Sequence, residues 1–305
     1  KTYRIEILAG LTVAMTMIPE SLSFAIVAGL PPLTGLYGAF IMGIITAFLG
    51  GRPGMISGGA GATVIVMIAL IATHGIEYFF AAVVLAGIFQ ITVGVFKLGK
   101  FVRLVPQPVM YGFLNGLAVV IFMSQIEQFK LKTGLQSSWL QGESLYIMGG
   151  LVALTLILVY FIPKISKALP TTLIAIAVIF GIVHFFNIDT KTVQDIASIS
   201  GGFPPFHIPE IPLNLDTLQI IFPYAAIMAG VGLLESLLTL TLVDEVTESR
   251  GNANKESVAQ GIANVANGFF TGMGGCAMIA QTFVNLNAGA RKRISAIVSS
   301  LAILF

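Results

Sequence analysis

The chain has 305 residues, of which 56% are hydrophobic and 10% are charged, and its mean hydropathy is +0.94. Soluble domains carry about 25% charged residues, so this composition excludes a water-soluble protein and indicates a polytopic helical membrane protein. The net charge of +2, from 16 basic and 14 acidic residues, provides neither a basic face nor an acidic tail, and we expect no nucleic-acid partner.

Eleven apolar segments come close to the roughly 20 residues that a helix needs to cross a bilayer. The third and tenth segments begin with glycine-rich stretches, which predict non-helical entries into half-length helices. In chain order the predicted spans are 8–30, 36–50, 57–73, 79–96, 105–126, 145–162, 171–186, 218–243, 258–271, 275–288 and 294 onward.

The basic residues in the loops predict the orientation of the chain. With the N-terminus in the cytoplasm, thirteen lysines and arginines fall in inside loops, whereas only Lys130, Lys132 and Lys191 fall in outside loops. This is the positive-inside pattern of proteins of the cell (inner) membrane. The longest polar interruption, 187–216, contains four prolines and is expected outside, as a linker between two halves.

Two acidic residues, Glu20 and Glu235, lie within the predicted spans, and no lysine or arginine accompanies them there. Gly58 follows Glu20 by 38 residues, and Gly274 follows Glu235 by 39 residues, each in a glycine-rich segment. This coincidence, at an offset near 215, predicts two repeats that each carry an acidic helix and a broken span.

Seven spans precede the second copy, and an odd number places the two copies in opposite membrane orientations. We therefore expect a first seven-span repeat at 1–200, an extracellular proline-rich linker at 201–216, and a second, inverted repeat at 217–305. The second repeat has only its first four spans here, so we expect a longer transporter with three more spans.

The two broken spans suggest an anion site. Half-helices whose N-terminal ends meet near the bilayer midplane offer unpaired N–H groups and positive dipole ends, which stabilise an anion without a cationic side chain. A nearby carboxylate can bind H⁺ or Na⁺, and Thr239, on the same helical face as Glu235, can add a hydroxyl ligand. The alternatives are a structural carboxylate between helices and an ordinary helix-packing threonine.

Other polar residues carry less information. The three histidines fall near outer span ends or in the linker, and Cys276 is the single cysteine, so we expect no metal site apart from Na⁺ at Glu235 and Thr239. The cluster of Asp244, Glu245, Glu248 and Arg250 is expected to be a solvated helix end, with gating of an inner vestibule as the alternative. The sequence contains no paired nucleophile and base, so we expect neither an enzyme nor a cofactor.

Several motifs point to one family. They are Ile-Pro-Glu-Ser-Leu-Ser-Phe-Ala at 18–25, Ala-Gly-Leu-Pro-Pro-Leu-Thr-Gly-Leu-Tyr-Gly-Ala-Phe at 28–40, Gly-Phe-Pro-Pro-Phe at 202–206, Asn-Lys-Glu at 254–256 and Gln-Gly-Ile-Ala-Asn at 260–264. Over essentially its whole length the chain resembles the sulfate permease (SulP) family of anion transporters. It departs from the family pattern at Thr34, where Tyr is usual, at Glu20, where Gln is common, and at 50–53.

The resemblance implies an all-α 7+7 inverted-repeat fold with a core domain and a gate domain, and an anion held between the third and tenth spans. It also implies an acidic residue on the eighth span, a position that Glu235 fits, and places Glu20 opposite the anion. Family members commonly end in a STAS domain, which this sequence lacks. The implied substrate-binding residues are Ser57, Gly58, Gly59, Ala60, Gly61, Ala62, Thr63, Gly275, Cys276, Ala277 and Met278.

These observations predict secondary active transport of small anions (sulfate, bicarbonate or a dicarboxylate) by alternating access. Coupling to H⁺ or Na⁺ is expected at Glu235, Glu20 and Thr239. The expected partners are the anion, the lipid bilayer and a second copy in a homodimer. Two alternatives remain: a nucleobase transporter of the same fold, and an anion channel or voltage-responsive motor, which would not respond to a cation gradient.

Overall fold

The computed structural model describes residues 2–99, 107–127, 129–133, 136–165, 171–190 and 202–304. The chain divides into two compact units, one formed by 1–111 with 199–305 and the other by 112–198. The first unit thus joins the two ends of the sequence, and the second holds its middle. This division agrees with the core and gate domains that the resemblance implies.

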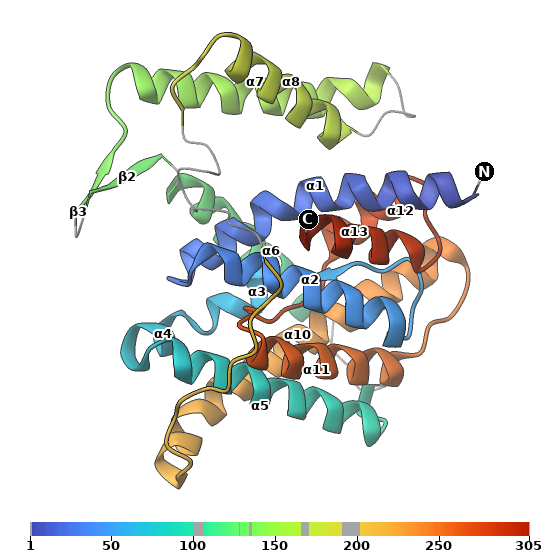
Figure 1. The fold of residues 1–305 in the computed structure, drawn as a ribbon. Coiled ribbons are helices and arrows are strands. Elements are labelled where there is room, and N and C mark those ends of the chain that lie inside the picture. Colours follow the sequence, from blue (N-terminus) through green and yellow to red (C-terminus); the bar gives the residue numbers. More distant parts are fainter. Residues whose placement is uncertain are drawn as a thin grey trace. The chain divides into compact units, whose positions relative to one another are not determined.

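In the first unit, helices from both ends of the sequence pack together. Helix α1 lies beside α13, and α5 lies beside α11 (Figure 1). The elements of this unit, apart from the start of α6, are α1 (Thr2–Val27), α2 (Pro32–Leu49), β1 (Ser57–Gly58), α3 (Gly61–Ile65), α4 (Ile68–His74), α5 (Ile76–Val95), α10 (Leu215–Thr247), α11 (Ala253–Phe269), β4 (Cys276–Ala277), α12 (Ile279–Asn287) and α13 (Ile294–Leu304).

The second unit contains most of α6, a short hairpin and two further helices. Strands β2 and β3 pair antiparallel, with Lys130 opposite Trp139. This hairpin was not predicted, and it occupies the predicted outside loop between the fifth and sixth spans. The elements are α6 (Gln107–Glu127), β2 (Lys130–Thr133), β3 (Gln136–Trp139), α7 (Glu143–Ile165) and α8 (Thr171–Phe185).

Each of the eleven predicted spans has a helical counterpart among the described residues. The third and tenth spans begin with the strands β1 and β4 and continue as short helices, which agrees with the predicted non-helical entries. Among the described residues, five helices are long and apolar enough to cross a membrane, namely α1 (from Tyr3), α2, α5, α7 (to Lys164) and α10. The all-helical membrane fold is therefore confirmed.

Two helices are longer than the predicted spans because polar caps extend them beyond the apolar segment. Asn214 caps the start of α10 by accepting a hydrogen bond from the Thr217 N–H (2.8 Å), and the left-handed residue Glu248 (φ 50°) ends it. Asn252 caps α11 by accepting from the Lys255 N–H (3.0 Å). Span length estimated from hydropathy alone leaves out these polar ends.

Glycine allows α5 and α11 to cross closely. A Cβ atom on Gly87 would lie 2.6 Å from the Gly261 carbonyl oxygen, and a Cβ atom on Gly261 would lie 2.6 Å from the Gly87 carbonyl oxygen. The two helix backbones therefore touch at this point, as small residues permit in membrane proteins. This contact fixes α11 beside the broken spans described below.

The loops meet at the two ends of the first unit as the predicted topology requires. At one end, Arg52 forms an ion pair with Asp244 (3.1 Å) and, with Arg291, lines a hollow between three predicted inside loops. At the other end, His207 contacts Glu77 (2.8 Å), so the predicted linker lies on the start of α5. These contacts place predicted inside loops together at one end and the predicted outside linker at the other. Which end faces the cytoplasm stays a prediction.

Some predictions concern residues that the structure does not describe. Lys1, Lys100, Arg103, Lys167, Lys191 and residues 191–201 of the linker lie outside the described part of the chain. The repeats at 1–200 and 217–305 follow sequence order and cut across the two compact units, so this division stays a prediction.

Candidate functional site

The two broken spans meet in the first unit. Strand β1 pairs antiparallel with β4, with Ser57 opposite Ala277 and Gly58 opposite Cys276. Helix α3 follows β1 after two residues, and α12 follows β4 after one. Both short helices therefore begin beside the same strand pair, which we call the crossing (β1, β4 and the first turns of α3 and α12).

Glycine is needed at the crossing for two different reasons. Gly274 has a φ of +71°, and a Cβ atom on Gly275 would overlap the Gly58 carbonyl, which belongs to the opposite strand. A Cβ atom on Gly59 would instead lie 2.5 Å from Cε of Met273, the end of a flexible side chain. The backbone leaves no room at Gly275, whereas a side chain could move aside at Gly59.

Neither short helix is capped by a side chain. The residues before the first turns, Ala60 and Met278, have extended backbones and make no side-chain cap hydrogen bond. The N–H groups at the start of α3 and α12 are thus free of side-chain caps, and both helix dipoles point their positive ends at the crossing. This arrangement can stabilise a negative charge.

The structure brings all eleven predicted substrate-binding residues to this place, and all are buried. Ser57 and Gly58 form β1, and Cys276 and Ala277 form β4. Gly61, Ala62 and Thr63 form the first turn of α3. The others lead into a strand or into the helix that follows it, namely Gly59, Ala60, Gly275 and Met278.

Glu235 lies on α10 against β4, and its side chain is buried, with 5% exposed. The Cys276 thiol donates to the Glu235 carboxylate (Sγ to Oε2, 3.1 Å). The next residue, Ser236, accepts a hydrogen bond from the Ala277 N–H (3.0 Å). Helix α10 therefore holds β4 by two side chains and places a carboxylate at the crossing.

Thr239 lies one turn further along α10. Its hydroxyl donates to the Glu235 carbonyl (2.8 Å) and lies 3.4 Å from the Ala277 carbonyl. A hydroxyl and two backbone carbonyl oxygens thus lie together, one helical turn from the residue that carries the carboxylate, and oxygen ligands suit hard cations. Within the described residues, no group of three or more His, Cys, Asp or Glu side chains could hold a metal ion.

Glu20 approaches the crossing from α1. Its carboxylate accepts a hydrogen bond from Nε2 of Gln281, on the first turn of α12, and Oε1 of Gln281 accepts from the Thr16 hydroxyl (2.6 Å). The two carboxylates predicted from the sequence therefore belong to the same site.

Four uncharged amides at the site had no predicted role, although the motif at 260–264 contains two of them. Polar side chains inside apolar spans were the signal that could have found them. Two are on α11 and one each on α5 and α12, and all are buried: Gln260, Asn264, Gln90 and Gln281.

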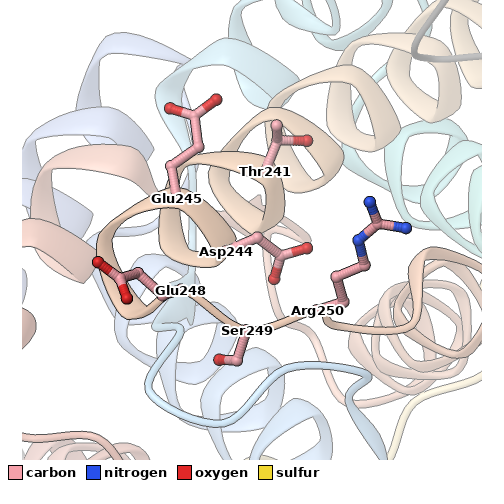
Figure 2. A pocket seen from close by; sticks show the side chains of 6 residues that line it. All are labelled: Thr241, Asp244, Glu245, Glu248, Ser249 and Arg250. Atoms are coloured by element: carbon pink, nitrogen blue, oxygen red, sulfur yellow. The ribbon is translucent and has the colours of Figure 1, made fainter.

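The acidic cluster at the end of α10 is separate from the crossing. Figure 2 shows the hollow that it lines together with Thr241 and Ser249. Asp244 is engaged there by Arg52 and by the Gly251 N–H (2.8 Å), while Glu248 ends the helix. These are the contacts of a helix end, the first interpretation given above.

Comparison with known proteins decides the family. The sequence model of the sulfate permease family matches residues 4–305. The chain belongs to this family. Its members are transporters and not enzymes, so the prediction that it is not an enzyme is confirmed.

Among curated relatives, "Putative sulfate transporter YbaR" of Bacillus subtilis is 45% identical over 99% of this chain and 61% of that protein. "Bicarbonate transporter BicA" of Picosynechococcus is 31% identical over 100% of this chain and 57% of that protein. The chain thus spans about six tenths of the length of the curated relatives that it matches.

A solved structure confirms the fold. The transmembrane domain of a cyanobacterial bicarbonate transporter, BicA, superposes with a TM-score of 0.82 at 30% identity, covering 100% of this chain and 82% of that one. The predicted 7+7 transporter architecture is therefore correct, and the chain is part of a multi-pass membrane protein.

Proposed function

We propose that this chain forms the anion-translocating part of a secondary active transporter. The observation that carries the proposal is the crossing, where two uncapped helix starts meet in antiparallel register beside Glu235. Helix starts of this kind bind anions through N–H groups and dipoles. The names of the relatives, which refer to sulfate and bicarbonate, indicate small oxyanions as substrates.

In this proposal the anion lies between the first turns of α3 and α12, and the cation binds beside it. Glu235 takes up H⁺ or, with the oxygens around Thr239, Na⁺, and its negative charge is neutralised when the cation binds. An anion is then held more tightly, because the repulsion from Glu235 is removed. In alternating access, the first unit exposes the site to one side of the membrane and then to the other, both when the anion and the cation are bound and when the site is empty.

The proposed setting is the cell membrane, with the N-terminus in the cytoplasm and two copies in a homodimer. The thirteen-to-three distribution of basic residues supports the orientation. The dimer is part of this proposal and is tested by the mass of the purified protein in detergent.

The proposal is tested by uptake into proteoliposomes that contain the full-length protein. Labelled sulfate, bicarbonate, fumarate and uracil are offered under an imposed Na⁺ or H⁺ gradient. We expect uptake of one anion, driven by one cation. Uptake of uracil alone would indicate a nucleobase transporter, and anion flux that ignores both gradients would indicate a channel; either result contradicts the proposal.

A further inference from the structure

Helix α11 presents two amide side chains to the crossing. Gln260 and Asn264 are four residues apart, and both are fully buried, with 0% exposed. Side chains four residues apart lie on the same face of a helix, about 6 Å apart along its axis. The two amides therefore form a short row along one side of α11.

Gln260 holds the first strand. Its Nε2 donates to Oγ of Ser57 in β1 (2.8 Å) and to Oε1 of Glu256 on the preceding turn of α11 (2.8 Å). Glu256 in turn accepts from the Gly51 N–H (2.6 Å). Because Oε1 of Glu256 accepts from this amide, Glu256 directs the nitrogen end of the Gln260 side chain, and not its oxygen, toward Ser57.

Asn264 holds the second strand. Its Oδ1 accepts from the Gly275 N–H (2.9 Å), and its Nδ2 donates to the Gly275 carbonyl (3.0 Å) and to Oε1 of Gln90 on α5 (2.8 Å). Both backbone groups of Gly275 are thus paired by one side chain, as a neighbouring strand would pair them. Gly275 directly precedes β4, so this contact fixes where β4 begins.

We propose that Gln260 and Asn264 are positioning residues that set the separation between the starts of α3 and α12. Neighbouring strands lie about 4.8 Å apart, close to the rise of one helical turn, so two amides one turn apart can each hold one strand. The inference rests on the proposed function, because that separation determines how well two sets of N–H groups fit one anion. Neither amide touches the anion itself.

Asn267 provides a matched control. It lies on the same helix as Asn264, is equally buried, and its side chain has no hydrogen-bond partner within the described residues. Asn267→Ala therefore removes the same atoms from the same helix without removing a bond to either strand. Any general loss of α11 stability should appear in both alanine variants.

The first test measures KM for labelled sulfate and bicarbonate in proteoliposomes with the full-length protein. We expect Asn264→Ala to raise KM about tenfold to a hundredfold, since small misplacements of binding groups have effects of this size. Gln260→Ala, which loses a bond to one hydroxyl, should raise KM less. An unchanged KM in Asn264→Ala, or an equal rise in Asn267→Ala, would overturn the inference.

The second test needs no anion and so separates this inference from the proposed function. Spin labels at Thr73→Cys on α4, which follows α3 after two residues, and Asn287→Cys at the end of α12 report the separation of the far ends of the two broken spans. Both positions are exposed, while Cys276 is buried. Asn264→Ala should broaden or shift the distance distribution, and Asn267→Ala should not. An unaltered distribution in Asn264→Ala refutes the positioning role even if the wild-type protein takes up no anion.

If Asn264→Ala does not fold, Asn264→Asp carries the distance test. This variant keeps the oxygen that accepts from the Gly275 N–H and loses the amide donor to the Gly275 carbonyl. The distance distribution should change less than on full removal, whereas KM is not used for this variant because the new carboxylate itself repels the anion. A wild-type distance distribution would contradict the proposal.

Discussion

Glu235 and Glu20 occupy matching places in the two predicted repeats, and each is followed by serine and leucine, yet their surroundings differ. Glu235 and Ser236 contact β4, the strand of their own repeat. Glu20 contacts Gln281 of the other repeat, and the buried hydroxyl of Ser21 has no partner within the described residues. The acidic residue of the second repeat thus contacts the strand of its own repeat, whereas the acidic residue of the first repeat contacts the short helix of the other repeat.

This difference suggests two roles for two similar carboxylates. A carboxylate that belongs to the fixed part of the site suits binding of a coupling cation, because its position changes little. Glu20 instead accepts a hydrogen bond from Gln281, which lies on the first turn of α12. A change in the charge of Glu20 therefore acts directly on the helix start that is proposed to bind the anion. The predictions below separate these roles.

The largest effect is expected from Gly275→Val. A side chain here would overlap the Gly58 carbonyl and separate β1 from β4, so anion uptake should fall to background. Gly59→Val should retain measurable uptake, because the side chain of Met273 can move aside. Uptake assays on both variants check this order, and a Gly275→Val protein with wild-type anion affinity would place the anion elsewhere.

Glu235→Gln should abolish gradient-driven uptake while the protein stays folded. Glutamine is similar in shape but has no charge to exchange with H⁺ or Na⁺, so the cation gradient can no longer drive the anion. The measurement compares anion uptake driven by a cation gradient with the exchange of labelled for unlabelled anion when no cation gradient is imposed. Full gradient-driven uptake in the variant would remove Glu235 from the coupling role.

Glu20→Gln should change the pH profile of uptake more than its maximum. If the Glu20 carboxylate takes up a proton during transport, wild-type uptake falls as the pH rises and the carboxylate ionises. The glutamine variant keeps Glu235 but lacks the Glu20 carboxyl group, so the part of the pH dependence that Glu20 contributes should be absent from its profile. Identical profiles in wild type and variant would show that Glu20 does not titrate during transport.

The smallest effects are expected from the two serines. Ser236→Ala leaves the buried Ala277 N–H without its partner, at a cost of about 1–3 kcal/mol, so the thermal midpoint in detergent should fall by a few degrees. Ser21→Ala removes a hydroxyl with no partner in the described structure and should leave the midpoint unchanged or slightly higher. An equal fall in the thermal midpoint of both variants would mean that the two serines contribute equally to stability, and would contradict the difference between the repeats.

Much of the fold follows from the sequence, because long apolar segments separated by charged loops have few ways to arrange in a bilayer. The broken spans were also predictable, since Ser57–Gly58 and Cys276–Ala277 lie in or beside glycine-rich stretches. The β2–β3 hairpin was missed because it lies in a polar loop without a strong turn signal.

The details of the site could not be predicted in the same way. The pairing of Ser57 with Ala277 joins residues far apart in the chain, and two-residue strands have no alternating pattern to reveal them. Gln281 and Asn264 are uncharged amides, which occur in membrane helices for packing as well as for function. Their contacts become visible only when α11 and α12 are placed in space.

The most direct test of the account is the affinity of the purified wild-type protein for labelled sulfate and bicarbonate at stepped Na⁺ concentrations and pH values. If Glu235 binds a cation beside the anion, the anion affinity should rise with one of the two cations, and by linkage the anion should tighten binding of that cation equally. Saturable anion binding whose affinity is independent of both Na⁺ and pH would contradict coupling at the crossing.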